Sequence, residues 1–354
     1  EESSAASDVY KRQMFSRRTG KGSTVCVFDP ADPSAGVREI FHTNDGFIFD
    51  ISPSYDGTKL LMSYKEHVDK AFHIWEIQVD GTGLRQVTSG NWHDVTPVYY
   101  PDGRIVFSSS RSEAFSVCQN FLAFNVYVCS GAGDDVRRID FTTLCSVSPS
   151  IMSDGSIICS RWEYQDKTLF TWQGLWTVNP NGRQLQLYYG NTLTVPQSLY
   201  GPRQIPGTDH VIYVMAGHHH PPASDLAICD RSRGVENVKA TWKVTNVLTG
   251  LNPRKPDNWR VTATGGDVVN YNAFTEPWPF SSDLSVVSYG GDGSGRASLV
   301  LLDHGGSIFP LHADPAGGCF SAVTLNARPR SDSVPGDCPQ EPAPGTFYVQ
   351  DIYQ

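Results

Sequence analysis

NWHDVTPVYYPDGRIVFSSSR, the stretch from Asn91 to Arg111, contains two short apolar strands that an Asp-Gly turn joins into a hairpin. A histidine precedes the first strand and an arginine follows the second. The same pattern occurs at Phe47–Lys65 (FIFDISPSYDGTKLLMSYK) and Cys145–Arg161 (CSVSPSIMSDGSIICSR), with looser versions at Tyr200–His218 and Phe274–Tyr289. The copies follow one another at about 45–55 residues with one longer gap, and repeats of that length built from short strands predict a β-propeller.

Each hairpin, formed by strands A and B, is followed by further strand-like segments. A third strand, C, runs apolar and ends in a polar turn in six copies, at 23–33, 73–81, 125–133, 174–182, 225–234 and 298–306. A more polar fourth strand, D, follows at 84–88, 136–140, 185–189 and 308–312. The sequence therefore predicts an all-β fold, a β-propeller of four-stranded blades. The six C strands predict six blades, and the additional segments Thr346–Tyr353 and Gly250–Asn272 leave seven blades open.

We expect residues 1–354 to form a single propeller domain. It would comprise a partial first blade at 8–45, the repeats at 46–330, and a Pro-rich loop with a last strand at 331–354. The first unit lacks its own strand A, and Cys319–Arg328 (CFSAVTLNAR) has the character to supply it. The N- and C-terminal segments would then pair and close the ring, which removes exposed sheet edges.

Composition limits the partners and the cellular location that can be expected of the protein. A net charge of −9 argues against a general nucleic-acid binder. No apolar run reaches the ~18–20 residues that a membrane helix needs. The start, EESSAASD, resembles a mature N-terminus left after removal of a signal peptide. We expect a monomeric protein that is secreted, extracellular or periplasmic.

The eight cysteines contain no CxxC or CxxCH spacing, so zinc-knuckle and covalent-haem sites have no support. Cys118 and Cys129 bracket one loop and its following strand, and Cys319 and Cys338 bracket a Pro-rich loop. Both pairs are predicted as disulfides, which favours export. The alternative is that they are buried free thiols.

Topology predicts where a ligand site lies. The A–B and C–D turns lie at one rim, whereas strand A starts and strand B ends at the other. Six basic side chains are therefore expected together at that second rim: Lys65, His73, His93, Arg111, Arg161 and His218. Such a cationic mouth suits carboxylate or sulfate groups, because arginine offers a bidentate fork. Alternatively, each arginine pairs with a structural acid such as Asp94, Glu163 or Asp166.

Histidines and a tyrosine near this mouth are candidates for proton transfer. His73 and His93 could act as acid and base, or as hydrogen-bonded structural residues. Tyr200 precedes the fifth strand A and could donate a proton, contact a sugar or pack the channel, and Arg203 follows it as a substrate-binding candidate. His218 and His220 lie on one side of an extended segment and could hold a divalent metal. No cofactor is otherwise required.

Several of these signatures together resemble a known family. YDGTKLLMSYK, IWEIQVDGTGLRQVT, PDGRIVFSSSR, LWTVNPNG and EPWPFSSDLSVVSYG, within about Phe47 to Arg330, resemble the propeller family that includes the middle domain of the hydrazine synthase alpha subunit. They resemble TolB-like propellers more distantly. The resemblance implies the fold; the haem-binding parts of that enzyme lie outside its propeller, so function has to be inferred from the site.

The sequence also resembles propeller polysaccharide lyases that act on ulvan and on rhamnose–glucuronate linkages. Those enzymes use two histidines, a tyrosine and an arginine that neutralises the uronate carboxylate. His73, His93 and Arg161 match the histidines and the arginine in order. Cys145 stands where the tyrosine is expected, and Tyr164 or Tyr200 would have to replace it.

Three functions follow from these observations. The first is a secreted lyase that cleaves a uronic-acid glycan by β-elimination. In it, Arg161 neutralises the carboxylate, a base among His73, His93 and Tyr200 removes the C5 proton, and Lys65, Arg111, Tyr164, Arg203 and His218 bind the acidic polysaccharide or oligosaccharide. The second is a non-catalytic carbohydrate-binding or structural propeller. The third is a hydrolase or metal enzyme built on His218–His220.

Overall fold

The computed structural model describes residues 21–115, 122–163, 173–193, 196, 198–216, 223–245, 274–290, 296–332 and 334. Within these ranges the regular structure consists of β-strands and three short 3-10 helices, η1 (Pro33–Ala35), η2 (Arg231–Arg233) and η3 (Val238–Ala240). No described helix has the length and apolar character needed to cross a bilayer. The predicted Thr346–Tyr353 strand and the Gly250–Asn272 insertion lie outside the described residues.

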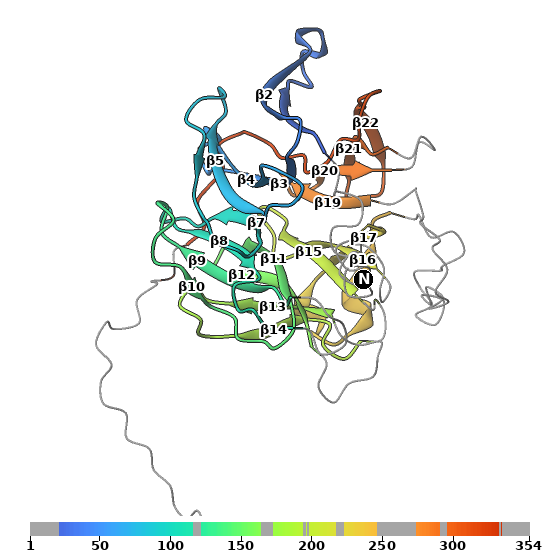
Figure 1. Ribbon diagram of the computed structural model, residues 1–354. Helices are drawn as coiled ribbons and strands as arrows, with labels where there is room; N and C mark the ends of the chain where they lie inside the picture. The colour runs from blue at the N-terminus through green and yellow to red at the C-terminus, as the bar shows by residue number, and fades with distance from the viewer. Residues whose placement is uncertain are drawn as a thin grey trace, which may run out of the picture.

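Five units of four antiparallel strands follow one another along the chain (Figure 1). The first two units are β3 (Phe47–Pro53), β4 (Lys59–Lys65), β5 (His73–Gln78) and β6 (Arg85–Gln86), then β7 (Asp94–Tyr99), β8 (Ile105–Ser109), β9 (Asn125–Cys129) and β10 (Arg137–Arg138). The third is β11 (Ser146–Ile151), β12 (Ile157–Trp162), β13 (Gln173–Val178) and β14 (Gln186–Tyr189). The last two are β15 (Ser198–Gln204), β16 (Val211–Ala216), β17 (Asp225–Cys229) and β18 (Thr241–Lys243), then β19 (Phe274–Pro279), β20 (Leu284–Tyr289), β21 (Ser298–Asp303) and β22 (Ile308–His312).

This arrangement is consistent with a β-propeller. The first strands β3, β7, β11, β15 and β19 face a common centre in Figure 1, and each contacts the next. A two-stranded sheet, β1 (Ser23–Phe28) with β2 (Val37–Thr43), precedes them. Five of the six predicted C segments are third strands of four-stranded units, and the sixth, at 23–33, contains β1.

The segment Cys319–Arg328, expected as a strand, is not a β-strand among the described residues. Its amides bond to side chains and loops instead of a strand ladder. For example, Ser321 N donates to Glu276 Oε2 at 2.7 Å, and Arg328 N donates to the Tyr55 carbonyl at 2.7 Å.

Every described strand A is interrupted by a β-bulge at the same place. In four of them the bulge contains an X-Pro pair whose first residue has positive φ: Thr96 (53°), Ser148 (55°), Gly201 (58°) and Glu276 (57°). Proline suits a bulge because the ladder there needs no N–H from it. Ser321, in the C-terminal part, has the same backbone conformation, with φ of 54°.

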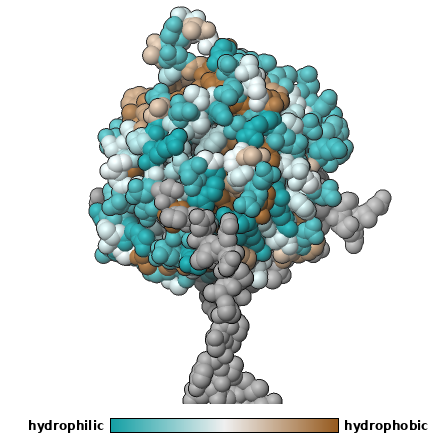
Figure 2. All heavy atoms as spheres, turned by 90° about the vertical axis from the view of Figure 1, so that its left-hand side faces the viewer, coloured by the Kyte–Doolittle hydropathy of each residue, from teal (hydrophilic) through white to brown (hydrophobic). Residues whose placement is uncertain are grey.

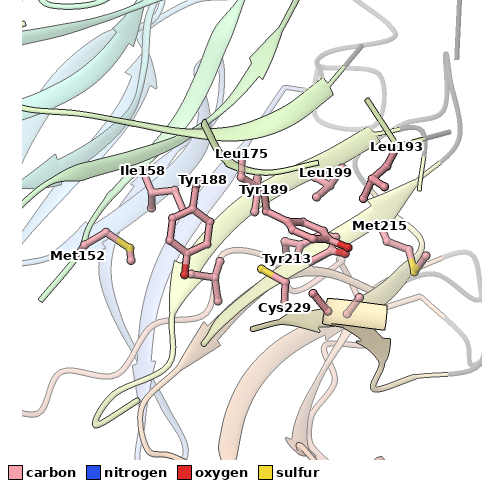
Figure 3. Close-up of a cluster of buried hydrophobic side chains, with 13 residues drawn as sticks. Met152, Ile158, Leu175, Tyr188, Tyr189, Leu193, Leu199, Tyr213, Met215 and Cys229 are labelled. Atoms are coloured by element: carbon pink, nitrogen blue, oxygen red, sulfur yellow. The ribbon is translucent and has the colours of Figure 1, made fainter. Parts of the chain in front are cut away.

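Apolar side chains fill the spaces between consecutive sheets. Figure 3 shows one such cluster, in which Ile158 and Leu175 of the third unit meet Leu199, Tyr213 and Cys229 of the fourth. Alternating apolar positions of neighbouring strands supply these contacts, as expected for sheets stacked face to face. In contrast, polar side chains cover most of the outer face seen in Figure 2, and the apolar ones there lie in small separate patches.

The predicted disulfides are not seen. Cys129 and Cys319 each carry a free thiol, while their expected partners Cys118 and Cys338 lie outside the described residues. Cys129 points into the apolar cluster between the first two four-stranded units, and burial raises its pKa to about 12. The alternative of a buried free thiol describes Cys129, so disulfides no longer support an exported location.

Candidate functional site

The predicted basic residues that the structure describes do gather at one end of the sheets. Lys65 ends β4 opposite the start of β5 at His73, and His93 immediately precedes β7, whose first residue pairs with the last of β8. The Asp-Gly turns at Asp56, Asp102 and Asp154 join strands A and B at the opposite end. We call these the B–C end and the A–B end. The topological map drawn from the sequence is correct for these units.

Charges at the B–C end are neutralised within the protein. Arg111 Nη2 lies 2.7 Å from Asp94 Oδ2 and its Nε lies 3.2 Å from Oδ1, so the guanidinium forms a bidentate ion pair with a fully buried carboxylate. Ser109 donates to the same carboxylate at 2.6 Å, and His73 Nδ1 lies 3.5 Å from it. Asp94, the first residue of β7, thus holds Arg111 in place, whereas His73 Nδ1 lies near it without a hydrogen bond.

Arg161 is held in the same way. Its Nη1 donates to the buried Asp140, its Nε donates to Glu163 at 2.9 Å, and its guanidinium lies 5.1 Å from the centre of the Trp176 ring. A guanidinium with two carboxylate partners has little capacity left for a substrate carboxylate. Pairing with structural acids, the alternative considered for the sequence, describes both Arg111 and Arg161.

The other predicted residues at this end surround an apolar cluster. Lys65 Nζ donates to the Val68 carbonyl at 3.2 Å and lies 5.1 Å from the centre of the Phe72 ring. His93 Nδ1 accepts the Phe72 N–H at 3.2 Å, which places the proton of the neutral imidazole on Nε2. The cluster itself is Phe47, Phe49, Phe72, Val95, Phe124 and Val147. Hydrophobic side chains therefore occupy much of the expected polar mouth.

Tyr200 lies close to Cys145, the residue that stands in the expected tyrosine position. Burial raises the pKa of the Tyr200 phenol above its ordinary value, and hydrogen bonds with Ser198 and Gln173 lower it only in part. A phenol with a raised pKa is a poor base near neutral pH. Tyr164, His218 and His220 lie outside the described residues, and the part of the chain that is described holds no group of three metal-ligating side chains.

A cavity lies at the A–B end. It has a volume of about 680 Å³ and opens among the ends of strands A, where β3, β7, β11, β15 and β19 meet their turns. Residues 324–332 form one of its walls. Hydroxyl and amide side chains are frequent in the lining, among them Ser52, Ser150, Ser153, Gln204, Thr324 and Asn326.

Two arginines and a tryptophan lie together in this cavity, whose lining also includes Arg330, Asp209 and Asp332. Arg203 from β15 lies 4.5 Å from the centre of the Trp278 ring, measured from its guanidinium carbon, and Arg328 lies 5.0 Å from the same ring. Arg328 also lies 5.1 Å from the centre of the Tyr55 ring. Burial, followed by the charge of Arg328, lowers the pKa of Arg203 to about 10. The site thus brings two positive charges together against one aromatic ring.

Neither guanidinium has an acidic partner at ion-pair distance within the described residues. Asp50 and Glu276 influence Arg203 only from further away. Arg328 Nη2 donates to the Pro53 carbonyl at 2.9 Å, and its Nε is buried without a hydrogen-bond partner. This is the opposite of the situation at Arg111 and Arg161.

Only Arg203, among the predicted site residues that the structure describes, lines the cavity. It lies at the opposite end of the sheets from His73, His93 and Arg161, because it is five positions along strand A from Ser198 at the B–C end. Trp278 and Arg328 were not predicted. Trp278 could have been found from the repeat. It lies two residues after Glu276 in β19, the position equivalent to Arg203, which lies two residues after Gly201 in β15.

Comparison with solved structures reveals the same fold in known proteins. A hydrazine synthase structure from Kuenenia stuttgartiensis matches with a TM-score of 0.72 at 18% identity, over 91% of this chain and 46% of that one. The chain shares its fold with hydrazine synthase. It therefore spans less than half of that chain's length, as a fold domain within a longer protein would.

Two TolB structures match with lower scores. The one from Agrobacterium tumefaciens has a TM-score of 0.55 at 14% identity, covering 82% of this chain and 88% of that one. The one from Acinetobacter baumannii has a TM-score of 0.54 at 13% identity, covering 89% and 69%. Both resemblances drawn from the sequence motifs are confirmed for the fold. No family model and no curated protein matches the chain.

Proposed function

We propose that the protein is a non-catalytic β-propeller module that binds an acidic oligosaccharide through its carboxylate groups in the A–B end cavity. The observation that carries the proposal is the Arg203–Trp278–Arg328 arrangement. Two guanidinium groups placed near each other repel, and burying them costs free energy unless an anion compensates. A ligand carboxylate between them would remove that repulsion and accept bidentate hydrogen bonds.

The rest of the lining suits a saccharide. A cavity of about 680 Å³ is in the range of small-ligand sites. Hydroxyl and amide side chains such as Ser150, Gln204 and Asn326 can donate to and accept from sugar hydroxyls. Aromatic rings at Tyr55 and Trp278 add apolar surface for the sugar faces.

The geometry favours binding over β-elimination. A lyase site at the B–C end needs an arginine that receives the uronate carboxylate and a histidine placed to take the C5 proton. Arg161 is already held by Asp140 and Glu163, and His93 Nδ1 already accepts the Phe72 amide. Arg203 and Arg328 have no acidic partner at ion-pair distance among the described residues and can bind a ligand carboxylate.

Calorimetric titration with trigalacturonate tests the proposal, with maltotriose as the neutral saccharide of equal length. We expect binding of the first and none of the second. Arg203→Met keeps the length of the side chain against Trp278 and should weaken binding roughly ten- to a hundredfold, the loss of one charged hydrogen-bond pair. Arg231→Met is the matched control, because Arg231 is exposed, stacks 5.0 Å from the Tyr188 ring and does not line the cavity.

Absorbance near 235 nm in the same samples separates binding from catalysis. A lyase creates an unsaturated uronate that absorbs there, and a binding module leaves the absorbance flat. A rise in absorbance that Arg161→Lys abolishes would overturn the module in favour of the lyase. Equal affinity for trigalacturonate and maltotriose would overturn the anion site.

A further inference from the structure

Residues 319–332, here called the C-terminal segment, join units that are far apart in the chain. The segment first contacts β19, where Ser321 N and Oγ donate to the Glu276 carboxylate at 2.7 and 3.1 Å. Trp278 Nε1 then donates to Thr324 Oγ1 at 3.1 Å. Val323 and Leu325 pack into the apolar cluster shared by β1, β2 and the β3–β6 sheet. The beginning of the segment is therefore anchored on both sides of the space between β19 and β3.

The second half crosses the A–B turns of three consecutive units, those after β3, β7 and β11. Tyr55 in the first turn receives the Arg328 amide at 2.7 Å, and Ser153 in the third turn receives the Asp332 amide at 3.0 Å. Between them Arg330 Nη1 donates to the Pro101 carbonyl at 3.1 Å. With the Arg328 side chain on Tyr55 and the Pro53 carbonyl, and Ser331 on the Tyr55 hydroxyl, these contacts are few and isolated, and Asn326, Ala327, Pro329 and Arg330 are exposed. A stretch held in this way opens at a lower free energy than a strand inside a sheet.

The same stretch contributes a third of the residues that line the cavity. Residues 324 and 326–332 line it, and Arg328 is one of its two central cations. The other cation, Arg203, comes from β15 and does not depend on the segment. We propose that seating of the C-terminal segment and binding of the anionic ligand are coupled, so that the ligand locks the segment across the A–B end.

The coupling rests on the proposed function and follows from linkage. A ligand that bonds Arg203 and Arg328 together has higher affinity when the segment is seated, and it must then favour the seated state by the same factor. Without ligand, the repulsion between Arg203 and Arg328 disfavours the seated segment. A carboxylate between the two groups attracts both, so the electrostatic interaction then favours seating. The cavity therefore closes most firmly around its ligand.

Glycines at two of the A–B turns allow the backbone of the C-terminal segment to pack closely against them. At Gly57, with φ of 71°, an added Cβ would come 1.7 Å from the Leu325 carbonyl oxygen. At Gly155, with φ of 81°, it would come 2.3 Å from the Asp332 carbonyl oxygen. Gly103 occupies the equivalent turn between them with φ of 93°, yet an added Cβ there meets nothing within 4 Å. Gly155→Ala and Gly103→Ala therefore share the cost of positive φ but differ in contact with the segment.

Hydrogen–deuterium exchange of the full chain, with and without trigalacturonate, tests the coupling. In the parent we expect trigalacturonate to slow exchange in peptides covering 319–332 about tenfold, with no change in β20 and no effect of maltotriose. Gly155→Ala should speed exchange of the segment without ligand and weaken trigalacturonate binding roughly tenfold, as expected from losing the Arg328 contact. Gly103→Ala should leave both quantities near the parent values.

Each outcome separates the two proposals. Binding of trigalacturonate with unchanged exchange in 319–332 would overturn the coupling and leave the binding function standing. Faster exchange in Gly155→Ala at full affinity would do the same. Absence of binding to the parent would overturn the function, and the coupling with it.

Discussion

At the scale of single residues, the position of a carboxylate partner decides what an arginine does. Arg111 and Arg161 form ion pairs with the buried Asp94 and Asp140, and removing either arginine would leave an unpaired carboxylate charge in the interior. Arg203 has no such partner within the described chain. A cation that the fold does not neutralise is available to a ligand.

Arg203→Met should stabilise the ligand-free protein while it weakens binding. Burial and Arg328 lower the pKa of Arg203 to about 10, so the charged form is less favourable in the folded than in the unfolded chain. This penalty is full below pH 10 and falls as the pH rises through 10 toward the unfolded value. After the lost contact with Trp278 is subtracted, we expect a gain of about 1–2 kcal/mol in the free energy of unfolding at pH 7.

Urea denaturation of the parent, Arg203→Met and the control Arg231→Met measures this gain. The gain should shrink when trigalacturonate is present, because only the parent is then stabilised by the ligand. A less stable Arg203→Met variant in the absence of ligand would show that Arg203 has a structural role.

At the scale of the element, the bulge in strand A is the repeated feature that directs side chains toward the A–B end cavity. It occurs in β3, β7, β11, β15 and β19 and inserts one extra residue relative to the partner strand each time. Because a bulge changes which face a residue occupies, it brings Arg203 and Trp278 to equivalent places in β15 and β19. The two side chains can then meet in the cavity.

Ser148→Gly should be more stable than Ser148→Ala by about 1 kcal/mol, since glycine adopts positive φ without a Cβ clash. The fourth unit already has Gly201 at this place. Thermal and urea unfolding of both variants measure the difference. Ser150, two residues further along β11, is the matched control; both of its variants lose the bond to the Pro202 carbonyl, and there alanine should be the better residue by about 0.5–1 kcal/mol. The same order at both positions would contradict a strained bulge.

At the scale of the whole molecule, tyrosine hydroxyls tie neighbouring sheets together beside the apolar clusters. Tyr99 of β7 donates to Glu76 of β5 at 2.9 Å, and Tyr100 donates to the Gly155 carbonyl at 2.9 Å. Glu76 also receives Arg85 Nε at 3.0 Å. Burial alone would raise the pKa of Glu76, but the bonds from Arg85 and Tyr99 outweigh it and lower the pKa.

Tyr99→Phe should cost about 1–2 kcal/mol at neutral pH, because a buried carboxylate loses one donor. A lowered pKa means that Glu76 stabilises the fold above its unfolded pKa and that this stabilisation disappears as the pH falls through the folded pKa. The difference between Tyr99→Phe and the parent should therefore shrink below about pH 4. Denaturation curves across pH 3–7 measure it, and a difference that stays constant would exclude the contact with Glu76 as its source.

The repeat itself was readable from the sequence, because it depends on local patterns. Alternating apolar residues, Asp-Gly turns and a fixed period are properties of neighbouring residues, and from them followed the order of strands and the end at which His73, His93 and Arg161 lie. Resemblance of the motifs also predicted the fold shared with hydrazine synthase and TolB.

Tertiary structure alone decided which charges are satisfied and where the cavity lies. Whether Arg161 is free depends on the distance to Asp140 in another sheet, and no periodicity contains that distance. The cavity needs Arg328, whose Nη2 reaches the Pro53 carbonyl across 275 positions of the chain. Contacts of that range form only in the folded chain, so the residues that build the site have no common signature in the sequence.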